Sequence, residues 1–328
     1  MTDDVRNVVL GESSPDAILA AVSLVRRIPG GADLMFANRD DLPRALQSPA
    51  HRNRQQPYRL HVVGPDIAPA FHDETLAAFA ADPFHSLHWY DANIWTPDAT
   101  IELDALTARG SWFNVARTHH PFPAIEAASR PLHLLEDPFA KKLVALAEGG
   151  LAEAEESDWG RAWRDSLEAL SGGGLGIIDS VKPLLHGMPA ELGVLDRGEG
   201  EALRAEVDDL LKNSRMIQIP VGEGDGLSGK AALLVLPDAR HQPATAMAEA
   251  ALAACDCGFA LVGYDRGDRA ILVGRRRGAD APVDVRPAFE RLLRLPFVRR
   301  DRLMRGYAVV RFLDPPKDAL ERVVAGLL

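Results

Sequence analysis

The chain has very little cysteine. Cys255 and Cys257 are the only two among 328 residues, too few for the disulfide framework of a small secreted domain. No apolar run is long enough to span a membrane, and the first residues lack the basic and apolar segments of a signal peptide. A single Cys-x-Cys pair is also a weak metal motif. The sequence therefore predicts a cytoplasmic protein with no membrane segment.

Lysine is missing from one long stretch of an otherwise acidic chain. The net charge is −10, yet residues 266–311 contain thirteen arginines, no lysine and five acidic residues, a local charge of +8. Arginine favours bidentate contacts with anions, so this segment could present a face to phosphates. The alternative is that these arginines lie on solvated helix faces or pair internally.

The first third alternates short apolar segments with amphipathic ones. Ser14 and Pro15 suit the N-cap and first turn of a helix, and a loop is expected at 11–15. Strands are expected at 5–10, 34–37, 59–63, 87–90 and 112–116, and helices at 16–27, 41–46 and 73–81. This alternation predicts an α/β fold with a parallel, doubly wound sheet.

The rest of the chain has a different pattern. Residues 123 to about 185 are helical in character, and a charged helix is expected at 199–213. Strands are then expected at 216–221, 231–236, 259–264 and 270–273, and helices at 244–254, 285–293 and 317–328. We expect an α/β domain with a helical appendage over 1–190, a helical connector over 191–213, and a smaller mixed-sheet α/β domain over 214–328.

Acidic and amide side chains follow the expected strands. Glu12 and Asp16 come after the first strand, Asp66 after the third, and Asp91 and Asn93 after the fourth. Ligands of parallel α/β sheets bind outside the carboxyl ends of the strands. These side chains are therefore expected at the ligand-binding edge of the sheet.

The segments Ser14-Pro15-Asp16 and Trp89-Tyr90-Asp91, in this order and spacing, resemble the RecJ-like DHH phosphoesterases. The resemblance implies a two-ion site built from four motifs: His-x-Asp-x-Asp-Gly after the first strand, an Asp after the third, Asp-His-His after the fourth and an Asp after the fifth. Two-metal catalysis needs several such ligands converging on ions about 3.5–4 Å apart.

This chain departs from the pattern at most of those positions. Asp16 and Asp91 match, and together with Glu12 and Asp66 they are the residual candidate metal ligands that the resemblance leaves. Such oxygen ligands suit hard cations such as Mn or Mg. Other residues stand at the remaining positions: Glu12, Ser14, Ala17, Gly64, Ala92, Asn93, and Ala116 or Arg117. His119 and His120, just past the fifth strand, could return an imidazole. If the protein is active, the candidate catalytic residues are thus Asp16, Asp91, Asn93, His119 and His120.

The C-terminal third resembles the DHH-associated domain. Residues 270–276 end in Arg275 and Arg276, and Arg305-Gly306-Tyr307 stands where the resemblance implies a Gly-Gly-His motif before the last strand. Arg275, Arg276, Arg305 and Gly306 are the candidate phosphate-binding residues. Tyr307 replaces the phosphate-contacting His that the resemblance implies.

The resemblance and its departures together predict a degenerate phosphoesterase. We expect a pseudoenzyme without a cofactor, binding a nucleotide, another phosphorylated ligand or a protein partner, with a homodimer possible. The alternative is a working Mn- or Mg-dependent hydrolase acting on small nucleotides or short oligonucleotides. A scaffold subunit is a third interpretation, which an extended apolar patch would support.

Overall fold

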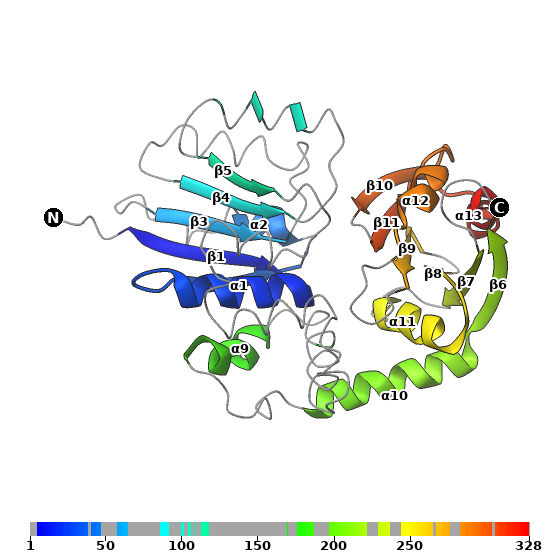
Figure 1. The fold of residues 1–328 in the computed structure, drawn as a ribbon, viewed down its shortest axis with the longest axis horizontal. Coiled ribbons are helices and arrows are strands. Elements are labelled where there is room, and N and C mark those ends of the chain that lie inside the picture. Colours follow the sequence, from blue (N-terminus) through cyan, green and yellow to red (C-terminus); the bar gives the residue numbers. More distant parts are fainter. Residues whose placement is uncertain are drawn as a thin grey trace. The chain divides into compact units, whose positions relative to one another are not determined.

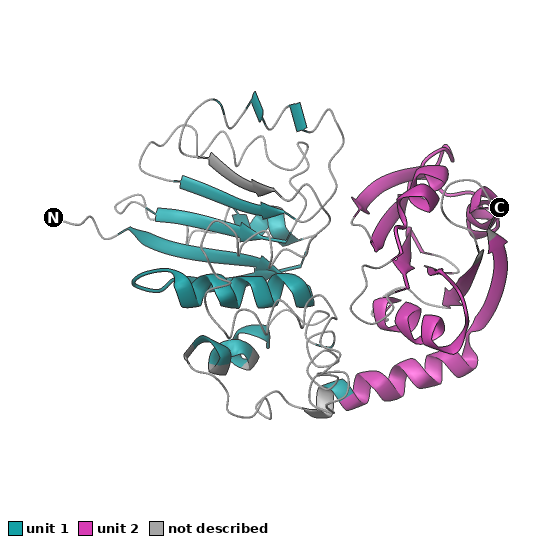
Figure 2. Ribbon diagram, viewed as in Figure 1, with its two compact units in different colours: residues 1–200 teal, residues 201–328 magenta. Residues whose placement is uncertain are grey.

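The computed structural model describes residues 5–38, 41–46, 58–64, 86–91, 100–101, 104–105, 108, 113–117, 169, 176–186, 197–221, 229–236, 244–264, 267–275, 283–303 and 306–327. The chain divides into two compact units, residues 1–200 and 201–328 (Figure 2). The expected helical appendage falls largely outside the described residues. No helix in the described ranges is long and apolar enough to cross a membrane.

The first unit contains a parallel five-stranded sheet (Figure 1). Its order is β2-β1-β3-β4-β5. The strands are β1 (Arg6–Glu12), β2 (Asp33–Ala37), β3 (Tyr58–Val63), β4 (Ser86–Asp91) and β5 (Phe113–Arg117). One face buries an apolar cluster that includes Trp89 and Leu46 of the short helix α2 (Leu42–Leu46). The expected parallel α/β sheet is confirmed.

Helix α1 (Pro15–Arg27) begins where the sequence predicts. Ser14 is the N-cap with extended backbone, although its side chain makes no capping hydrogen bond, and Pro15 fills the first turn. Residues 17–24 of the helix are buried. The helix packs against β1 and against α9 (Ile177–His186).

The expectation of a loop at 11–15 is wrong for its first two residues, because β1 continues through Glu12. Gly11 pairs with Phe36 on one side and Val63 on the other, so the ladder holds it in the strand. An added Cβ at Gly11 would lie 2.7 Å from the Phe36 ring and 3.3 Å from the Ala21 Cβ. Glycine marks close packing here and not a turn.

The second unit contains a mixed six-stranded sheet of order β10-β11-β9-β8-β7-β6. Only β7 and β8 pair in parallel. The strands are β6 (Arg215–Val221), β7 (Gly229–Leu236), β8 (Phe259–Tyr264), β9 (Arg269–Gly274), β10 (Val298–Leu303) and β11 (Tyr307–Phe312). This confirms the smaller mixed-sheet α/β part of the prediction.

Helices cover both faces of this second sheet. Helix α11 (Ala244–Ala254) packs on β7, β8 and β9, whereas α12 (Arg286–Leu292) packs on β10, β11 and the last helix, α13 (Ala319–Leu327). Helix α10 (Arg197–Asn213) adds Val207 to the core on the α11 side. The predicted connector is therefore also part of this unit's packing.

Candidate functional site

The topology of the parallel sheet marks one ligand-binding position. From β1 the chain moves to β2 on one side, and β3, β4 and β5 then follow on the other side. The strand order thus reverses between β1 and β3. Ligands of open α/β sheets bind at such a point, outside the carboxyl ends of the strands.

Three sequence-predicted positions lie in one row at this edge. Gly11 pairs with Val63, and Val63 pairs with Tyr90, so the next residues Glu12, Gly64 and Asp91 follow in register across β1, β3 and β4. The Gly64 N–H donates to the Tyr90 carbonyl oxygen at 2.9 Å. Neighbouring strands are about 4.8 Å apart, so Glu12 and Asp91 flank a glycine in a continuous row.

Both flanking carboxylates are buried. Glu12 is 6% exposed and Asp91 is 2% exposed, beside Ser13 at 8%. Burying an ionised carboxylate is costly unless hydrogen bonds or opposite charge compensate it, which makes this edge chemically distinctive. Asp16 lies in the first turn of α1, where the helix dipole favours a negative charge.

The centre of the row has no room for a side chain. Gly64 has φ +99°, a backbone conformation that favours glycine, and an ideal Cβ there would lie 2.5 Å from the Ala17 Cβ. The same Cβ would lie 3.5 Å from Glu12 Oε2. Ala17, in the first turn of α1, therefore occupies the space that a side chain at position 64 would need.

The described residues of this edge do not by themselves supply a two-ion metal site. Across the ranges that the structure describes, no three His, Cys, Asp or Glu side chains are grouped to hold a metal ion. Two ions need several converging anionic or imidazole ligands, and the middle of the row offers only glycine and an alanine methyl. Four further predicted candidates lie outside the described residues: Asp66, Asn93, His119 and His120.

Beside the row lies a buried polar cluster that the sequence did not predict. His61 of β3 is directly opposite His88 of β4, and their rings stack with centroids 5.0 Å apart. His61 Nδ1 and the Tyr90 hydroxyl form a hydrogen bond of 3.0 Å. This bond joins β3 to the residue immediately before Asp91. The available signal was the strand register, which places His61, His88 and Tyr90 on one face.

The imidazoles of this cluster are held neutral. Burial, then the neighbouring His88 and Arg59, lower the pKa of His61 to about 3. Burial and Arg59 lower the pKa of His88 to about 4. Burial raises the pKa of the Tyr90 hydroxyl. Near neutral pH this cluster therefore supplies uncharged hydrogen-bonding groups beside the edge.

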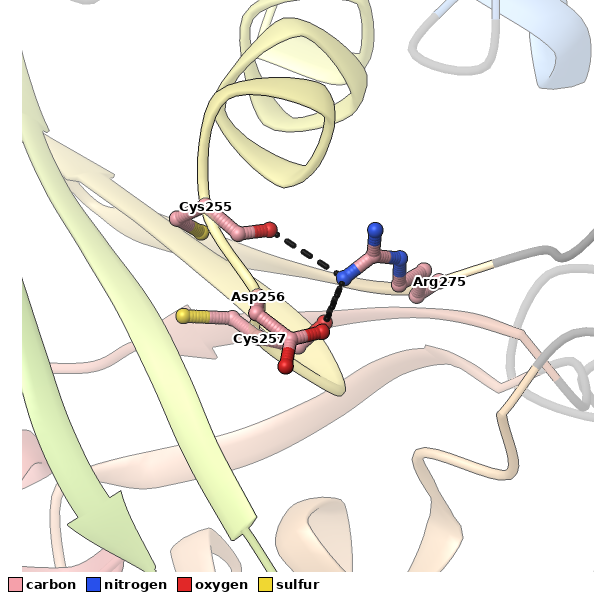
Figure 3. Close-up of polar contacts among 4 residues, drawn as sticks. All are labelled: Cys255, Asp256, Cys257 and Arg275. Atoms are coloured by element: carbon pink, nitrogen blue, oxygen red, sulfur yellow. Dashed lines mark hydrogen bonds and ion pairs between the residues drawn. The ribbon is translucent and has the colours of Figure 1, made fainter.

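In the second unit, the candidate Arg275 holds a turn (Figure 3). Its Nη1 donates to the Cys255 carbonyl oxygen at 3.1 Å and to Asp256 Oδ1 at 2.9 Å. A longer contact of 3.5 Å reaches the Cys257 carbonyl oxygen. The remaining guanidinium nitrogens point away from the turn (Figure 3), so one edge of the side chain is committed to structure.

Gly306 lies close to the end of β9. The Gly274 N–H donates to the Gly306 carbonyl oxygen at 2.7 Å, and the Arg275 N–H donates to the Gly258 carbonyl oxygen at 2.8 Å. The structure thus brings Arg275 and Gly306 to the same end of the sheet. Arg276 and Arg305 lie outside the described residues.

No model of a known protein family matches the sequence, and no curated protein matches it. Solved structures do match its fold. A DHH-domain protein described as a member of the S1p family of ribosomal proteins superposes with a TM-score of 0.61 at 13% identity, covering 98% of this chain and 85% of that one. RecJ from Thermus thermophilus, solved with Mn²⁺, superposes with a TM-score of 0.53 at 16% identity, covering 97% of this chain and 51% of RecJ. The chain therefore has the RecJ-like DHH fold.

Proposed function

We propose that this protein is a non-catalytic member of the DHH superfamily that binds a nucleotide or another phosphorylated ligand. The observation that supports this most strongly is the Ala17 methyl group beside Gly64. The resemblance to the DHH phosphoesterases implies a glycine at position 17 and an aspartate at position 64. In this chain position 17 carries an alanine and position 64 a glycine, so the larger side chain is now the one at position 17.

A substitution at position 64 alone would not restore the aspartate that the resemblance implies. A carboxylate at position 64 would need the Ala17 methyl group to move, because the two Cβ atoms would be only 2.5 Å apart. It would also place a second acid beside the buried Glu12, and like charges that close disfavour each other's ionised form. The site is thus packed for an uncharged centre.

The proposed ligand contact lies in the second unit. Arg275 and Gly306 lie at one end of the mixed sheet, and Arg276 and Arg305 neighbour them in sequence. Arginine can bind phosphate bidentately without a metal ion. Arg275 uses Nη1 for its bonds to the Cys255–Cys257 turn, and its other guanidinium nitrogens face away from that turn (Figure 3).

A working Mn- or Mg-dependent phosphoesterase is the second candidate. The observation that favours it is the burial of Glu12 and Asp91 at the switch point of the sheet. Together with Asp16, and with Asn93, His119 or His120, they would form the site, and RecJ of similar fold was solved with Mn²⁺. In this candidate the metal would activate water for attack on phosphorus.

A role in protein binding, including a homodimer, is less supported. The large exposed apolar residues of the described ranges are Val5, Ile101, Met216 and Leu313. They are dispersed along the sequence, and single exposed apolar residues are ordinary. We propose a cytoplasmic location on the low cysteine content alone.

Calorimetric titration of the whole protein with AMP and with a dinucleotide, without metal and then with Mn²⁺, tests the proposal. We expect nucleotide binding without Mn²⁺ and no binding of two Mn²⁺ ions per chain. Arg275→Gln should weaken nucleotide binding, whereas Arg322→Gln, which changes an exposed arginine paired with Asp318, should not.

Arg275→Gln also disturbs the turn, so Asp256→Ala serves as the second control. It removes the carboxylate partner of Arg275 but keeps the guanidinium. Equal loss of binding in both variants would show a structural effect and reject the arginine contact. Two Mn²⁺ ions per chain would reject the non-catalytic proposal.

A further inference from the structure

The two edge strands of the mixed sheet differ in how well they are protected from pairing with another strand. The sheet begins with β10 and ends with β6 (Figure 1). Strand β10 is highly charged and its register with β11 contains a bulge; charges and bulges both keep edge strands from pairing. Strand β6 pairs with β7 without a register shift and has no charged residue from Met216 to Val221. Strand β6 is thus the less protected edge.

One hydrogen bond shows which backbone groups of β6 face away from β7. The Lys230 carbonyl oxygen of β7 accepts from the Gly258 N–H at 2.9 Å, immediately before β8. A strand residue directs its N–H and its carbonyl to the same side, so Lys230 bonds away from β6. Lys230 lies directly opposite Pro220, and this pair therefore exchanges no hydrogen bond. Proline, which has no N–H, is confined to such positions in edge strands.

The same alternation places further main-chain groups of β6 on its outer side. Bonded and non-bonded pairs alternate along an antiparallel ladder, so Met216 and Gln218 face outward as Pro220 does. Within the described ranges, no backbone hydrogen bond reaches this side of β6. Met216 is 41% exposed, and Gln218 and Pro220 are exposed as well. The open edge therefore offers an N–H and a carbonyl at Met216 and at Gln218, and a carbonyl at Pro220.

The sequence of β6 is complementary to itself in the antiparallel direction. A two-fold axis at Gln218 would place this residue opposite Gln218 of a second copy. Met216 would then lie opposite Pro220, so that the Met216 N–H meets a carbonyl that is free to accept. On the other face of the sheet, Ile217 would lie opposite Ile219. Apolar side chains thus meet apolar side chains on both faces, and the missing proline N–H costs one bond at each end.

The position of Arg215 favours the antiparallel arrangement. It is the charged residue of β6 and lies at the first position of the strand. In an antiparallel pair the two Arg215 side chains lie at opposite ends, about 20 Å apart at the rise of an extended strand. This distance exceeds the Debye length of about 8 Å at physiological salt. A parallel pair in register would instead bring the two guanidinium groups together.

We propose that β6 pairs with β6 of a second copy of this chain, antiparallel and centred on Gln218, so that two six-stranded sheets become continuous. Dispersed apolar side chains give no support for a dimer, but the open main chain of β6 does. A single pair of strands buries less surface than stable interfaces do, so we expect a dissociation constant of about 10–100 µM. The inference is independent of the proposed ligand.

Sedimentation velocity of the whole protein between about 1 and 300 µM tests this inference. We expect a shift from one chain to two as the concentration rises. Gln218→Lys and Gln218→Glu should each weaken association at least roughly tenfold, because each places like charges directly opposite each other. An equimolar mixture of the two variants should associate again. The control is Glu290→Gln, in which an exposed residue of α12 undergoes the same change in net charge as Gln218→Lys.

Hydrogen exchange identifies the surface that associates. The Met216 and Gln218 N–H groups should exchange more slowly at high than at low protein concentration, whereas those of Ile217 and Ile219, which face β7, should be protected at both. A wild type that stays monomeric, Gln218 variants that associate as tightly as the wild type, or a mixture that stays monomeric would each overturn the inference. Protection of Met216 and Gln218 in a monomer would assign the edge to another segment of the chain and also reject it.

Discussion

The methyl group of Ala17 occupies the space that a side chain at Gly64 would need, with only 2.5 Å between the Ala17 Cβ and an ideal Cβ at position 64. One residue belongs to the first turn of α1 and the other follows β3. The pair therefore marks how closely α1 approaches the carboxyl end of β3.

We expect Gly64→Ala to lower the free energy of unfolding by about 2–4 kcal/mol, since it combines backbone strain with overpacking. Urea denaturation gives the value. Gly30→Ala is the control, because Gly30 has φ +81° but nothing within 4 Å of an added Cβ; it should cost only about 1 kcal/mol. The Ala17→Gly, Gly64→Ala double variant should recover part of the loss. Additive losses would mean that the two positions do not compete for space.

Acid should destabilise the first unit through His61. Its pKa is about 3 in the fold against 6.5 ordinarily, so the unfolded chain binds the proton first as the pH falls. Stability from the neutral imidazole is complete above pH 6.5 and is lost progressively as the pH falls towards 3. Between about pH 7 and pH 5 the loss from His61 should be about 2 kcal/mol.

The measurement is the urea midpoint of the first unit's transition at about pH 7 and about pH 5, for wild type and for His61→Asn. The variant is less stable at neutral pH, because it loses the bond to Tyr90, but its dependence on pH should be shallower. The same slope in both proteins would assign the acid sensitivity to other groups, among them His88, whose pKa is also lowered by burial.

Much of the fold was predictable because its elements follow strong local patterns. Helix α11 spans 244–254 as predicted, because alanine has the highest helix propensity and this segment is rich in alanine without a break. By contrast, β10 was absent from the predicted strands. Its sequence Val298-Arg299-Arg300-Asp301-Arg302-Leu303 is too charged to indicate a strand, and only its pairing with β11 at the edge of the sheet makes it one.

The candidate site was predictable in position but not in packing. Glu12 and Asp91 do lie at the carboxyl edge, because strand ends in a parallel sheet converge there. The contact between Ala17 and position 64 depends on a positive φ and on the approach of α1, neither of which has a sequence signal. The turn held by Arg275 joins residues 19 positions apart, which local patterns cannot reveal.

Arg275 should also contribute to stability. Arg275→Gln removes its bonds to the Cys255 carbonyl oxygen and to Asp256, and we expect a loss of about 1–3 kcal/mol because buried carbonyl groups lose a charged donor. Asp256→Asn should change stability by less than about 0.5 kcal/mol, since that carboxylate is 91% exposed. Denaturation of both variants in urea distinguishes them, and equal losses would assign the stabilisation to the ion pair.

The end of β9 is packed too closely for any side chain at position 274. An added Cβ there would lie 2.1 Å from the Val283 carbonyl oxygen, whereas one at Gly258 would meet nothing closer than 4.0 Å. Gly274→Ala should therefore lower the unfolding free energy by about 1–3 kcal/mol, and Gly258→Ala by much less. Equal effects would show that the strand end relaxes freely.

Turnover is the most direct test of the proposal that this protein is non-catalytic. Hydrolysis of a short oligonucleotide and of cyclic dinucleotides should be measured with Mn²⁺ for wild type and for Asp91→Ala. We predict no hydrolysis above the protein-free blank for wild type and no difference in Asp91→Ala. Hydrolysis by the wild type that disappears in Asp91→Ala would contradict this account.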